Sequence, residues 1–429
     1  MERALKSQPA VPTLVPRPQP IWGIVDQGCS AASNFLLSVV VARFVPAREF
    51  GAFAVALVVP TVGILLSRSV ATEPLFVRFA GVAGAPLRRG AEQALRASVG
   101  VGLALGVLAV VAGLAWGGTL GALLVVAGVI APLVSAQDAG RAVCFTAGRP
   151  IAAAFLDGSW LVIQLVAFVA LVVLVDNPAA WQFLLLWGLA GGLSGLALAI
   201  WAPLWPGSVR SKRWLVEHKA TIRPTLAANT LTAAPAQLVW LLMPLVAGLT
   251  ELGRLRGAYV IFGPLGVLHE GVAMALLPSL TARARLHRIV GSCIRVSLVL
   301  ALAALCWGLS VAFMPRSLGE WLFGQSWQGA AKVRLVLSLS LLAEAVLVGA
   351  ALVLRANGRQ AELAAVRLRS APITLAGVLL GAWMGGATCA AVGFVAGYGL
   401  AAVLGWRSAL RGSHGSVIPL RRPRSAADG

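Results

Sequence analysis

Acidic and basic side chains are rare in this sequence, and that scarcity decides its broad class. Charged residues make up 12% of the 429 residues, whereas hydrophobic residues make up 59%. A soluble globular domain carries about a quarter charged residues. The composition therefore excludes an ordinary soluble protein and indicates a chain that folds within a lipid bilayer.

The sequence also lacks the motifs of common enzyme classes. It contains no GxxxxGK[ST] loop, no HExxH pair and no Cys/His cluster, and its five cysteines are scattered without paired spacing. The first motif would cradle nucleotide phosphates, and the others would bind a metal. The longest loop expected outside, near 315–332, is too short for a catalytic domain. We therefore expect no enzyme activity, no catalytic residue, no cofactor and no metal site.

Long apolar segments recur along the whole chain. A membrane-spanning helix needs about 20 mostly apolar residues. The sequence predicts an all-α integral membrane protein with about 12 transmembrane helices, which leaves almost no length for a soluble domain. The expected spans are 21–43, 49–69, 96–116, 119–138, 151–175, 180–203, 224–249, 256–280, 290–313, 333–354, 364–384 and 387–406.

The basic residues are distributed unevenly between the loops. The formal net charge of +20 is typical of nucleic-acid binding,. With the N-terminus in the cytoplasm, however, most Lys and Arg lie in the tails and in the loops after even-numbered spans, which is the positive-inside pattern. We therefore expect a multi-pass protein of the cell (inner or plasma) membrane with both termini cytoplasmic and no nucleic-acid partner. The basic residues left outside are Arg43, Arg48, Arg254, Arg256, Arg316, Lys332 and Arg334.

The two halves of the sequence repeat one plan. Because both halves begin in the cytoplasm, they predict two parallel six-helix lobes related by an axis along the membrane normal. Two such lobes create a crevice that can open to either side by rocking, as in a transporter. Chance similarity among Ala/Gly/Arg-rich segments is the alternative. The matching landmarks are Arg48 and Arg254, Pro60 and Pro264, and Gly148 and Gly358.

The expected domain boundaries follow from this repeat and from the composition of the tails. The sequence ends are rich in Pro, Gly, Ser and basic residues, and a basic stretch separates the two halves. The expected domains are a Pro-rich cytoplasmic N-tail at 1–20, an N-lobe at 21–203, a basic cytoplasmic linker at 204–223, a C-lobe at 224–406 and a basic cytoplasmic C-tail at 407–429.

Polar side chains line one stripe of the first span. Gln27, Ser30, Asn34 and Ser38 recur at helical spacing, and the seventh span carries Asn229 and Gln237. Small and polar residues commonly join helices in lipid, so packing and cavity lining are both open for the hydroxyls. The amides of Asn34 and Gln237 need several hydrogen-bond partners, which favours a polar cavity.

Three carboxyls are candidates for coupling to an ion gradient. Glu270 lies near the middle of the eighth span and Glu344 near the middle of the tenth. A carboxyl at membrane depth is a functional-site hypothesis, here for a proton or sodium gradient. The alternative is a structural carboxyl bonded across a helix interface. Asp26 lies nearer the cytoplasmic edge of the first span, where water can reach it.

Arg43 and Arg68 each stand near the end of a span. A terminal arginine often extends its head to the membrane surface. A guanidinium at a cavity mouth also suits phosphate, because its planar fork donates two parallel hydrogen bonds. Both interpretations stay open.

The opening segment resembles a known family. It is similar to the polysaccharide-exporter branch, the lipid-linked oligosaccharide flippases, of the multidrug/oligosaccharidyl-lipid/polysaccharide (MOP) exporter superfamily. The strong match covers the first two spans, and the rest agrees in layout. The residues that carry it are Asp26-Gln27, Ser33-Asn34-Phe35-Leu36-Leu37, Ala42-Arg43-Phe44, Glu49-Phe50-Gly51, Phe53, Arg68, Glu73-Pro74-Leu75, Arg141 and Gly148-Arg149.

The resemblance implies a V-shaped bundle of the multidrug-exporter type that moves a polyprenyl-pyrophosphate-linked glycan from the inner to the outer leaflet. The sugar and pyrophosphate would cross through a cationic cavity while the lipid tail stays in the bilayer. Its implied setting is polysaccharide biosynthesis, including lipopolysaccharide or exopolysaccharide export. Relatives often carry 14 spans, so the expected 12 would be a departure.

Three functions remain to be distinguished. The leading hypothesis is a flippase whose partners are a lipid-linked glycan, membrane lipids and glycan polymerase or assembly proteins. The first alternative is a small-molecule or drug exporter, either of the multidrug type or of the major-facilitator type, although the GxxxDRxGRR signature of the latter is absent after the second span. The second is a non-transport component of an envelope-glycan assembly complex.

Overall fold

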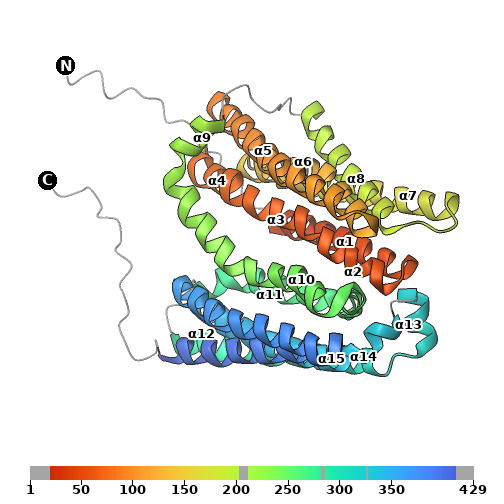
Figure 1. The fold of residues 1–429 in the computed structure, drawn as a ribbon. Helices are drawn as coiled ribbons and strands as arrows, with labels where there is room; N and C mark the ends of the chain where they lie inside the picture. Colours follow the sequence, from red (N-terminus) through yellow and green to blue (C-terminus); the bar gives the residue numbers. More distant parts are fainter. Residues whose placement is uncertain (1–19, 202–210, 282–285, 325–326, 412–429) are drawn as a thin grey trace, which may run out of the picture. The chain divides into compact units, whose positions relative to one another are not determined.

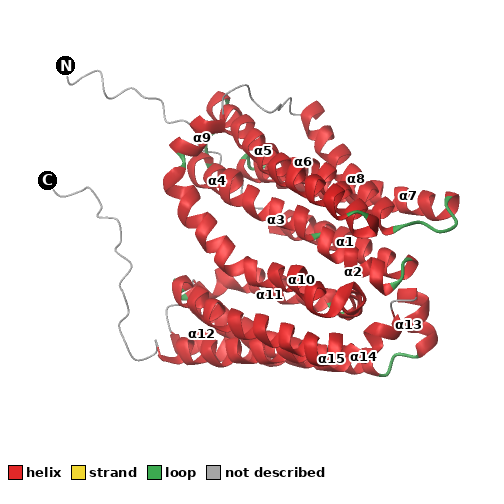
Figure 2. Ribbon diagram, viewed as in Figure 1, coloured by secondary structure: helices red, strands yellow, loops and turns green. Residues whose placement is uncertain are grey.

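The computed structural model describes residues 20–201, 211–281, 286–324 and 327–411 (Figure 1). Every element in these ranges is a helix (Figure 2). The all-α fold expected from the apolar segments is therefore confirmed. The predicted tails fall almost wholly outside the described ranges, apart from Pro20 and the residues up to Arg411.

The chain forms two compact units. Unit 1 comprises Met1–Val260 and Ser317–Gln328, and unit 2 comprises Ile261–Arg316 and Gly329–Gly429. The lobe boundaries predicted at 203 and 224 stay a prediction. The helices of the first half are α1 (Pro20–Phe44), α2 (Ala47–Ala56), α3 (Val58–Ser67), the π-helix η1 (Arg68–Thr72), α4 (Glu73–Phe79), α5 (Ala85–Trp116), α6 (Gly118–Thr146), α7 (Pro150–Leu174) and α8 (Ala180–Trp201).

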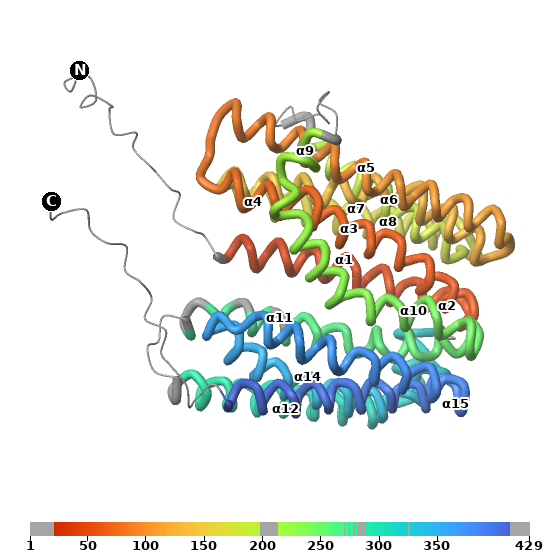
Figure 3. Tube along the Cα trace, turned by 60° about the vertical axis from the view of Figure 1, so that its left-hand side comes forward, coloured from red at the N-terminus to blue at the C-terminus, as the bar shows by residue number. Residues whose placement is uncertain are grey.

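The remaining helices complete both units. Within unit 2, α12, α14 and α15 run side by side (Figures 1 and 3). The helices are α9 (Ser211–Glu217), α10 (Lys219–Ile261), α11 (Gly263–Thr281), α12 (Leu286–Ala312), α13 (Arg316–Phe323), α14 (Trp327–Ala356) and α15 (Gln360–Arg411).

Ten helical stretches in the described ranges are long and apolar enough to cross a membrane, which makes this a multi-pass membrane protein. The sequence predicted about twelve, and the difference arises at the eighth expected span and at the last two. The eleventh and twelfth expected spans form α15, which bends where Gly385 and Gly386 leave helical geometry. The seventh expected span lies in α10, which bends at Gly248 and also contains the start of the eighth. Glycine accepts the positive φ that such a bend requires. The rest of the eighth lies in α11, whose apolar part Gly263–Leu277 is shorter than the ten stretches.

The second span differs from its prediction. It was expected to end near residue 69, but the helical stretch runs from Ala47 to Phe79 and contains a π-helical turn. Arg68 therefore lies inside the span and begins this turn. A π-turn widens the helix and leaves carbonyls without their usual partners. The carbonyl of Val70 accepts a hydrogen bond from Trp214 Nε1 of α9, 2.9 Å away.

Glycine sets how closely the helices approach. On α5 and α6, a Cβ added at Gly106 would lie 2.4 Å from the carbonyl oxygen of Gly128. A Cβ at Gly381 in α15 would lie 2.2 Å from the carbonyl oxygen of Cys389 after the bend. Helices in lipid associate through close packing at small residues. Glycines at such crossings therefore supply backbone contact where a soluble protein would bury large side chains.

Candidate functional site

A cavity of about 440 Å³ lies within unit 1. It is lined by residues of α1, α2, α3, η1, α8 and α10. Three of the predicted site residues, Asn34, Arg68 and Gln237, share its wall. Arg256 and the rings of Trp187 and Trp240 also line it, and the described lining includes no aspartate or glutamate. The cavity is therefore cationic, amide-bearing and aromatic.

Arg256 is the cation that the sequence did not place in this cavity. Its guanidinium carbon lies 5.1 Å from the centre of the Trp240 ring and 6.0 Å from that of Tyr259. Within the described part of the chain, its Nε is buried without a hydrogen-bond partner and no carboxylate pairs with it. Aromatic faces stabilise a cation without neutralising it. No described carboxylate therefore neutralises Arg256 at the cavity wall.

Arg68 is the second cation of the cavity, and it has a carboxylate partner. Its Nε donates to Asp138 Oδ2 at 3.0 Å, and its Nη2 donates to Asp138 Oδ1 at 2.7 Å. This is the bidentate fork-to-fork geometry of a strong ion pair. The Asp138 side chain is 8% exposed, whereas that of Arg68 is 46% exposed. Arg68 thus stands between the cavity and a buried acid.

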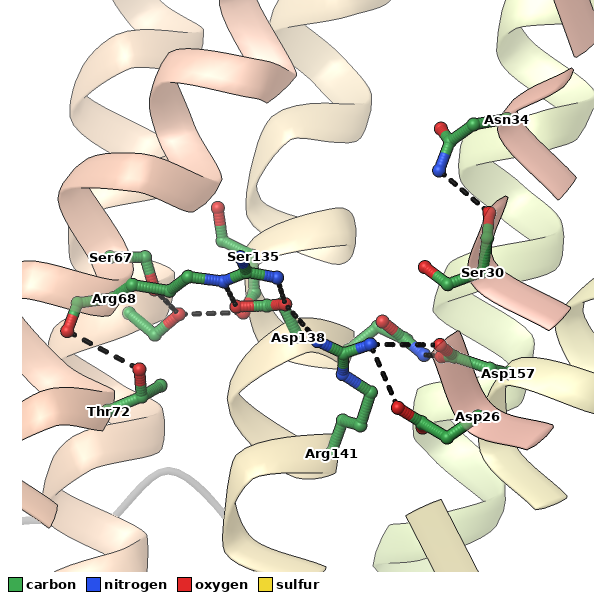
Figure 4. Close-up of polar contacts among 12 residues, drawn as sticks. Asp26, Ser30, Asn34, Ser67, Arg68, Thr72, Ser135, Asp138, Arg141 and Asp157 are labelled. Atoms are coloured by element: carbon green, nitrogen blue, oxygen red, sulfur yellow. Dashed lines mark hydrogen bonds and ion pairs between the residues drawn. The ribbon is translucent and has the colours of Figure 1, made fainter. Parts of the chain in front are cut away.

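A buried ionic network lies behind Arg68 (Figure 4). Arg141 Nη1 lies 3.2 Å from Asp26 Oδ2 and 3.1 Å from Asp157 Oδ2. Its Nη2 lies 3.6 Å from Asp138 Oδ1. The network joins α1, η1, α6 and α7, and it contains three carboxyls for two guanidinium groups. With all groups ionised it carries one uncompensated negative charge.

Asp26 is the member of this network whose carboxylate has an oxygen without a hydrogen-bond donor in the described structure. The residue is 3% exposed, and its Oδ1 is buried without a hydrogen-bond partner in the described structure. Hydration at the cytoplasmic edge, one of the sequence interpretations, therefore does not hold in this conformation. A buried carboxylate oxygen without a donor costs free energy that protonation would remove. The geometry makes Asp26 the group of the network best suited to take up a proton.

Three other predicted cavity residues lie elsewhere in unit 1. Arg43 is exposed, and its guanidinium carbon lies 5.5 Å from the Trp321 ring rather than at the cavity wall. Asn229 Nδ2 donates to Ser69 Oγ at 2.9 Å and so joins α10 to the π-turn. Gln27 is exposed on α1 and is not part of the described cavity wall.

The two carboxyls predicted in the second half belong to unit 2. Glu344 Oε2 lies 3.9 Å from Nδ1 of His269, a histidine that is 2% exposed. Glu270 lies in α11, but its side chain falls outside the described part of the structure. A coupling role for either carboxyl stays a prediction.

Sequence reasoning missed four residues of this site: Asp138, Arg141, Asp157 and Arg256. Asp138 and Arg141 are one helical turn apart, and Asp157 lies within the next span. Intramembrane charges of opposite sign on neighbouring spans indicate a buried pair. That signal was present, although the sequence alone does not show which helices meet.

Comparisons with known proteins identify the fold. No family model matches the chain, and no curated protein sequence matches it. Among solved structures, the chain is similar to the lipid II flippase MurJ in an inward closed conformation, with a TM-score of 0.74, 8% identity and coverage of 91% of this chain and 87% of that one.

The chain is also similar to an inward-facing multidrug resistance MATE family transporter of the MOP superfamily. The TM-score is 0.69 at 15% identity, with 89% of this chain and 94% of that one covered. An outward-facing structure of such a transporter gives 0.55 at 12% identity, with 91% and 93% covered. Sequence identities this low support a similarity in fold and nothing further. The predicted superfamily-type fold is therefore confirmed, while the polysaccharide-exporter branch stays a prediction.

Proposed function

We propose that this protein is a flippase that moves a polyprenyl-pyrophosphate-linked glycan from the inner to the outer leaflet by alternating access. The observation that carries the proposal is the chemistry of the cavity in unit 1. Arg256 offers a charge with no carboxylate partner among the described residues, and the described lining holds no acid. Such a wall favours an anionic ligand and disfavours an organic cation.

The parts of the substrate would be divided between the cavity and the lipid. Arg256 and Arg68, which share the cavity wall, would bind the pyrophosphate through charge-assisted hydrogen bonds,. The amides of Asn34 and Gln237 would bind sugar hydroxyls, since each amide offers both donors and an acceptor. The polyprenyl tail would remain in the bilayer, where its burial needs no protein contact. Membrane lipids and glycan assembly proteins are the proposed partners.

Proton movement would drive the cycle through Asp26. The buried Oδ1 of Asp26 accepts no hydrogen bond in the described structure, which supports this assignment. For Glu344, the described geometry shows only its Oε2 at 3.9 Å from Nδ1 of His269. A sodium ion is the alternative coupling ion. The proposed setting is the cell membrane, with both termini in the cytoplasm and without enzyme activity.

Export of a small molecule is the second candidate, and the similarity in fold to MATE transporters favours it. It differs from the flippase in the charge of the cargo. An organic cation would meet the positive charge of Arg256 at the cavity wall, and the described wall supplies no carboxylate to offset it.

Flipping of a fluorescent lipid-linked glycan in reconstituted liposomes tests the proposal. Arg256→Gln should lower the initial rate by about 10- to 100-fold, since a hydrogen bond to a charged group contributes about 1.5–3 kcal/mol. Arg256→Lys should recover part of the rate because it keeps the charge. The matched control is Arg254→Gln, because Arg254 lies two residues away and pairs with Glu251 rather than lining the cavity.

Two outcomes would contradict the flippase. One is an Arg256→Gln rate equal to that of the Arg254→Gln control. The other is transport of an organic cation with no movement of the glycan lipid by the wild-type protein. In cells, a deletion strain should accumulate a lipid-linked sugar on the cytoplasmic side.

A further inference from the structure

The ionic network of unit 1 connects the cavity wall to Asp26 without interruption. Arg68 lines the cavity and pairs with Asp138, Asp138 lies near Arg141, and Arg141 pairs with Asp26 (Figure 4). The successive N–O distances are 2.7, 3.6 and 3.2 Å. Any change in the partner of Arg68 therefore reaches Asp26 through two shared ion pairs.

Arg68 cannot serve Asp138 and an incoming phosphate with the same donors. Nε and Nη2 are both directed at Asp138. A phosphate that takes the bidentate face of the guanidinium leaves Asp138 without its main partner. Asp138 then competes for Arg141, whose Nη2 already lies 3.6 Å away.

The charge balance shows where this competition leads. Asp26, Asp138 and Asp157 would then share Arg141 alone, with two negative charges in excess. Two uncompensated carboxylates in a buried site are unfavourable, so one of them binds a proton. Asp26 is the best placed, because its Oδ1 has no donor in the described structure even before the competition begins.

The groups that face Asp26 from the packed helices agree with this assignment. α6 contributes Asp138, Arg141 and the thiol of Cys144, α7 contributes Asp157, and η1 contributes Arg68. Cys29 lies one turn away on α1 itself. The described part of α8, which also packs on α1, carries no ionisable side chain. Both cations available to Asp26 are therefore members of the network.

We propose that Arg68, Asp138, Arg141 and Asp26 form a relay in which binding of the substrate pyrophosphate at Arg68 is linked to uptake of one proton from solvent at Asp26. This inference rests on the proposed function. Asp138 and Arg141 act as positioning residues, since neither lies at the cavity wall. By reciprocity, protonation of Asp26 strengthens pyrophosphate binding to the same degree.

Calorimetry on the full-length protein in detergent tests the relay. The probe is geranyl-pyrophosphoryl-N-acetylglucosamine, a soluble pyrophosphate diester whose own charge stays constant between about pH 5.5 and about pH 8. Titration in two buffers of different ionisation enthalpy counts the protons taken up. The wild type should take up close to one proton per ligand, and its affinity should rise as pH falls.

Variants separate the steps. Asp26→Asn should bind the probe with no proton uptake and with an affinity that no longer changes with pH. Asp138→Asn should also lose the uptake, while its affinity should rise by about tenfold because Arg68 is released. Asp176→Asn, an exposed aspartate outside the network, is the matched control and should behave as the wild type.

The outcomes distinguish the relay from the function. Probe binding without proton uptake by the wild type overturns the relay and leaves the flippase standing. Uptake that survives Asp26→Asn but disappears in Glu344→Gln also overturns it, because the coupling carboxyl would then belong to unit 2. Failure of the wild type to bind the probe overturns the phosphate cavity and the relay together. The wild-type measurement decides the matter even if Asp138→Asn does not fold.

Discussion

The contact between α2 and α10 gives the sharpest prediction about stability. A Cβ added at Gly51 would lie 1.9 Å from the carbonyl oxygen of Leu249, and one at Gly253 would lie 1.8 Å from that of Ala47. These neighbours are backbone atoms, so no side chain can turn aside. An ordinary carbon–oxygen contact near 3.4 Å requires the helices to separate by about 1.5 Å. Gly51→Ala should therefore cost about 1–3 kcal/mol, the range for overpacking a tight interface.

Thermal unfolding in detergent, followed by tryptophan fluorescence, measures this cost. Gly100→Ala is the matched control, because its added Cβ would meet open space on α5 and should be neutral or slightly stabilising,. The double variant Gly51→Ala/Gly253→Ala should cost less than the sum of the single changes, since one separation admits both methyl groups. Equal unfolding midpoints for Gly51→Ala and Gly100→Ala would refute the close crossing.

Two further predictions concern polar contacts between helices. Gln164→Leu should destabilise the protein by about 1 kcal/mol. The fully buried Gln164 accepts a hydrogen bond from the Ser33 hydroxyl and donates one to the Ser33 carbonyl, and both would be lost. A thermal midpoint unchanged from the wild type would contradict this. Trp214→Phe should keep the stacking on Phe79 but lose the hydrogen bond to the Val70 carbonyl, at a cost of about 1 kcal/mol,. Amide hydrogen exchange at the π-turn should then become faster. Unchanged exchange there would show that Trp214 does not stabilise the turn.

The fold was predictable because the bilayer restricts the choices. Every backbone polar group in lipid needs a partner within its own segment, so apolar runs of sufficient length become helices. The kinks in α10 and α15 were harder to predict. Gly248, Gly385 and Gly386 lie among many glycines that stay helical, and only the packing around each one decides which bends.

The π-turn illustrates a second limit of the sequence. Its residues, RSVAT, have no composition that distinguishes them from an ordinary helix. The turn is held by partners distant in sequence, Trp214 and Asn229. Because those contacts exist only in the folded protein, the sequence did not indicate that the helix continues beyond Arg68 to Phe79.

Part of the cavity wall could be anticipated where one helix determines the arrangement, while a substrate role for these residues stays a prediction. The spacing of Asn34 on α1 placed it on a polar stripe, and the structure brings it to the same cavity as Arg68 and Gln237. The prediction missed Arg256, which counted only as an outside charge. The aromatic rings that hold Arg256 include Trp240, on the other side of the bend in α10, and a periodicity argument does not extend across a bend.

In unit 1, the three acids of the ionic network lie deeper than the cations of the cavity wall, and Arg141 lies among them. The cations Arg68 and Arg256 line the cavity, whereas Asp26, Asp138 and Asp157 are buried behind it and are absent from its described wall. If the carboxylates lined the wall, they would repel a phosphate; if they were missing, Arg68 would bind phosphate at any pH and release would have no trigger. With the acids behind Arg68, the same guanidinium has a competing partner inside the protein. In the proposed relay, protonation of the network would weaken that competition and deprotonation would restore it. The site would then change its affinity for an anion without gaining or losing a cation.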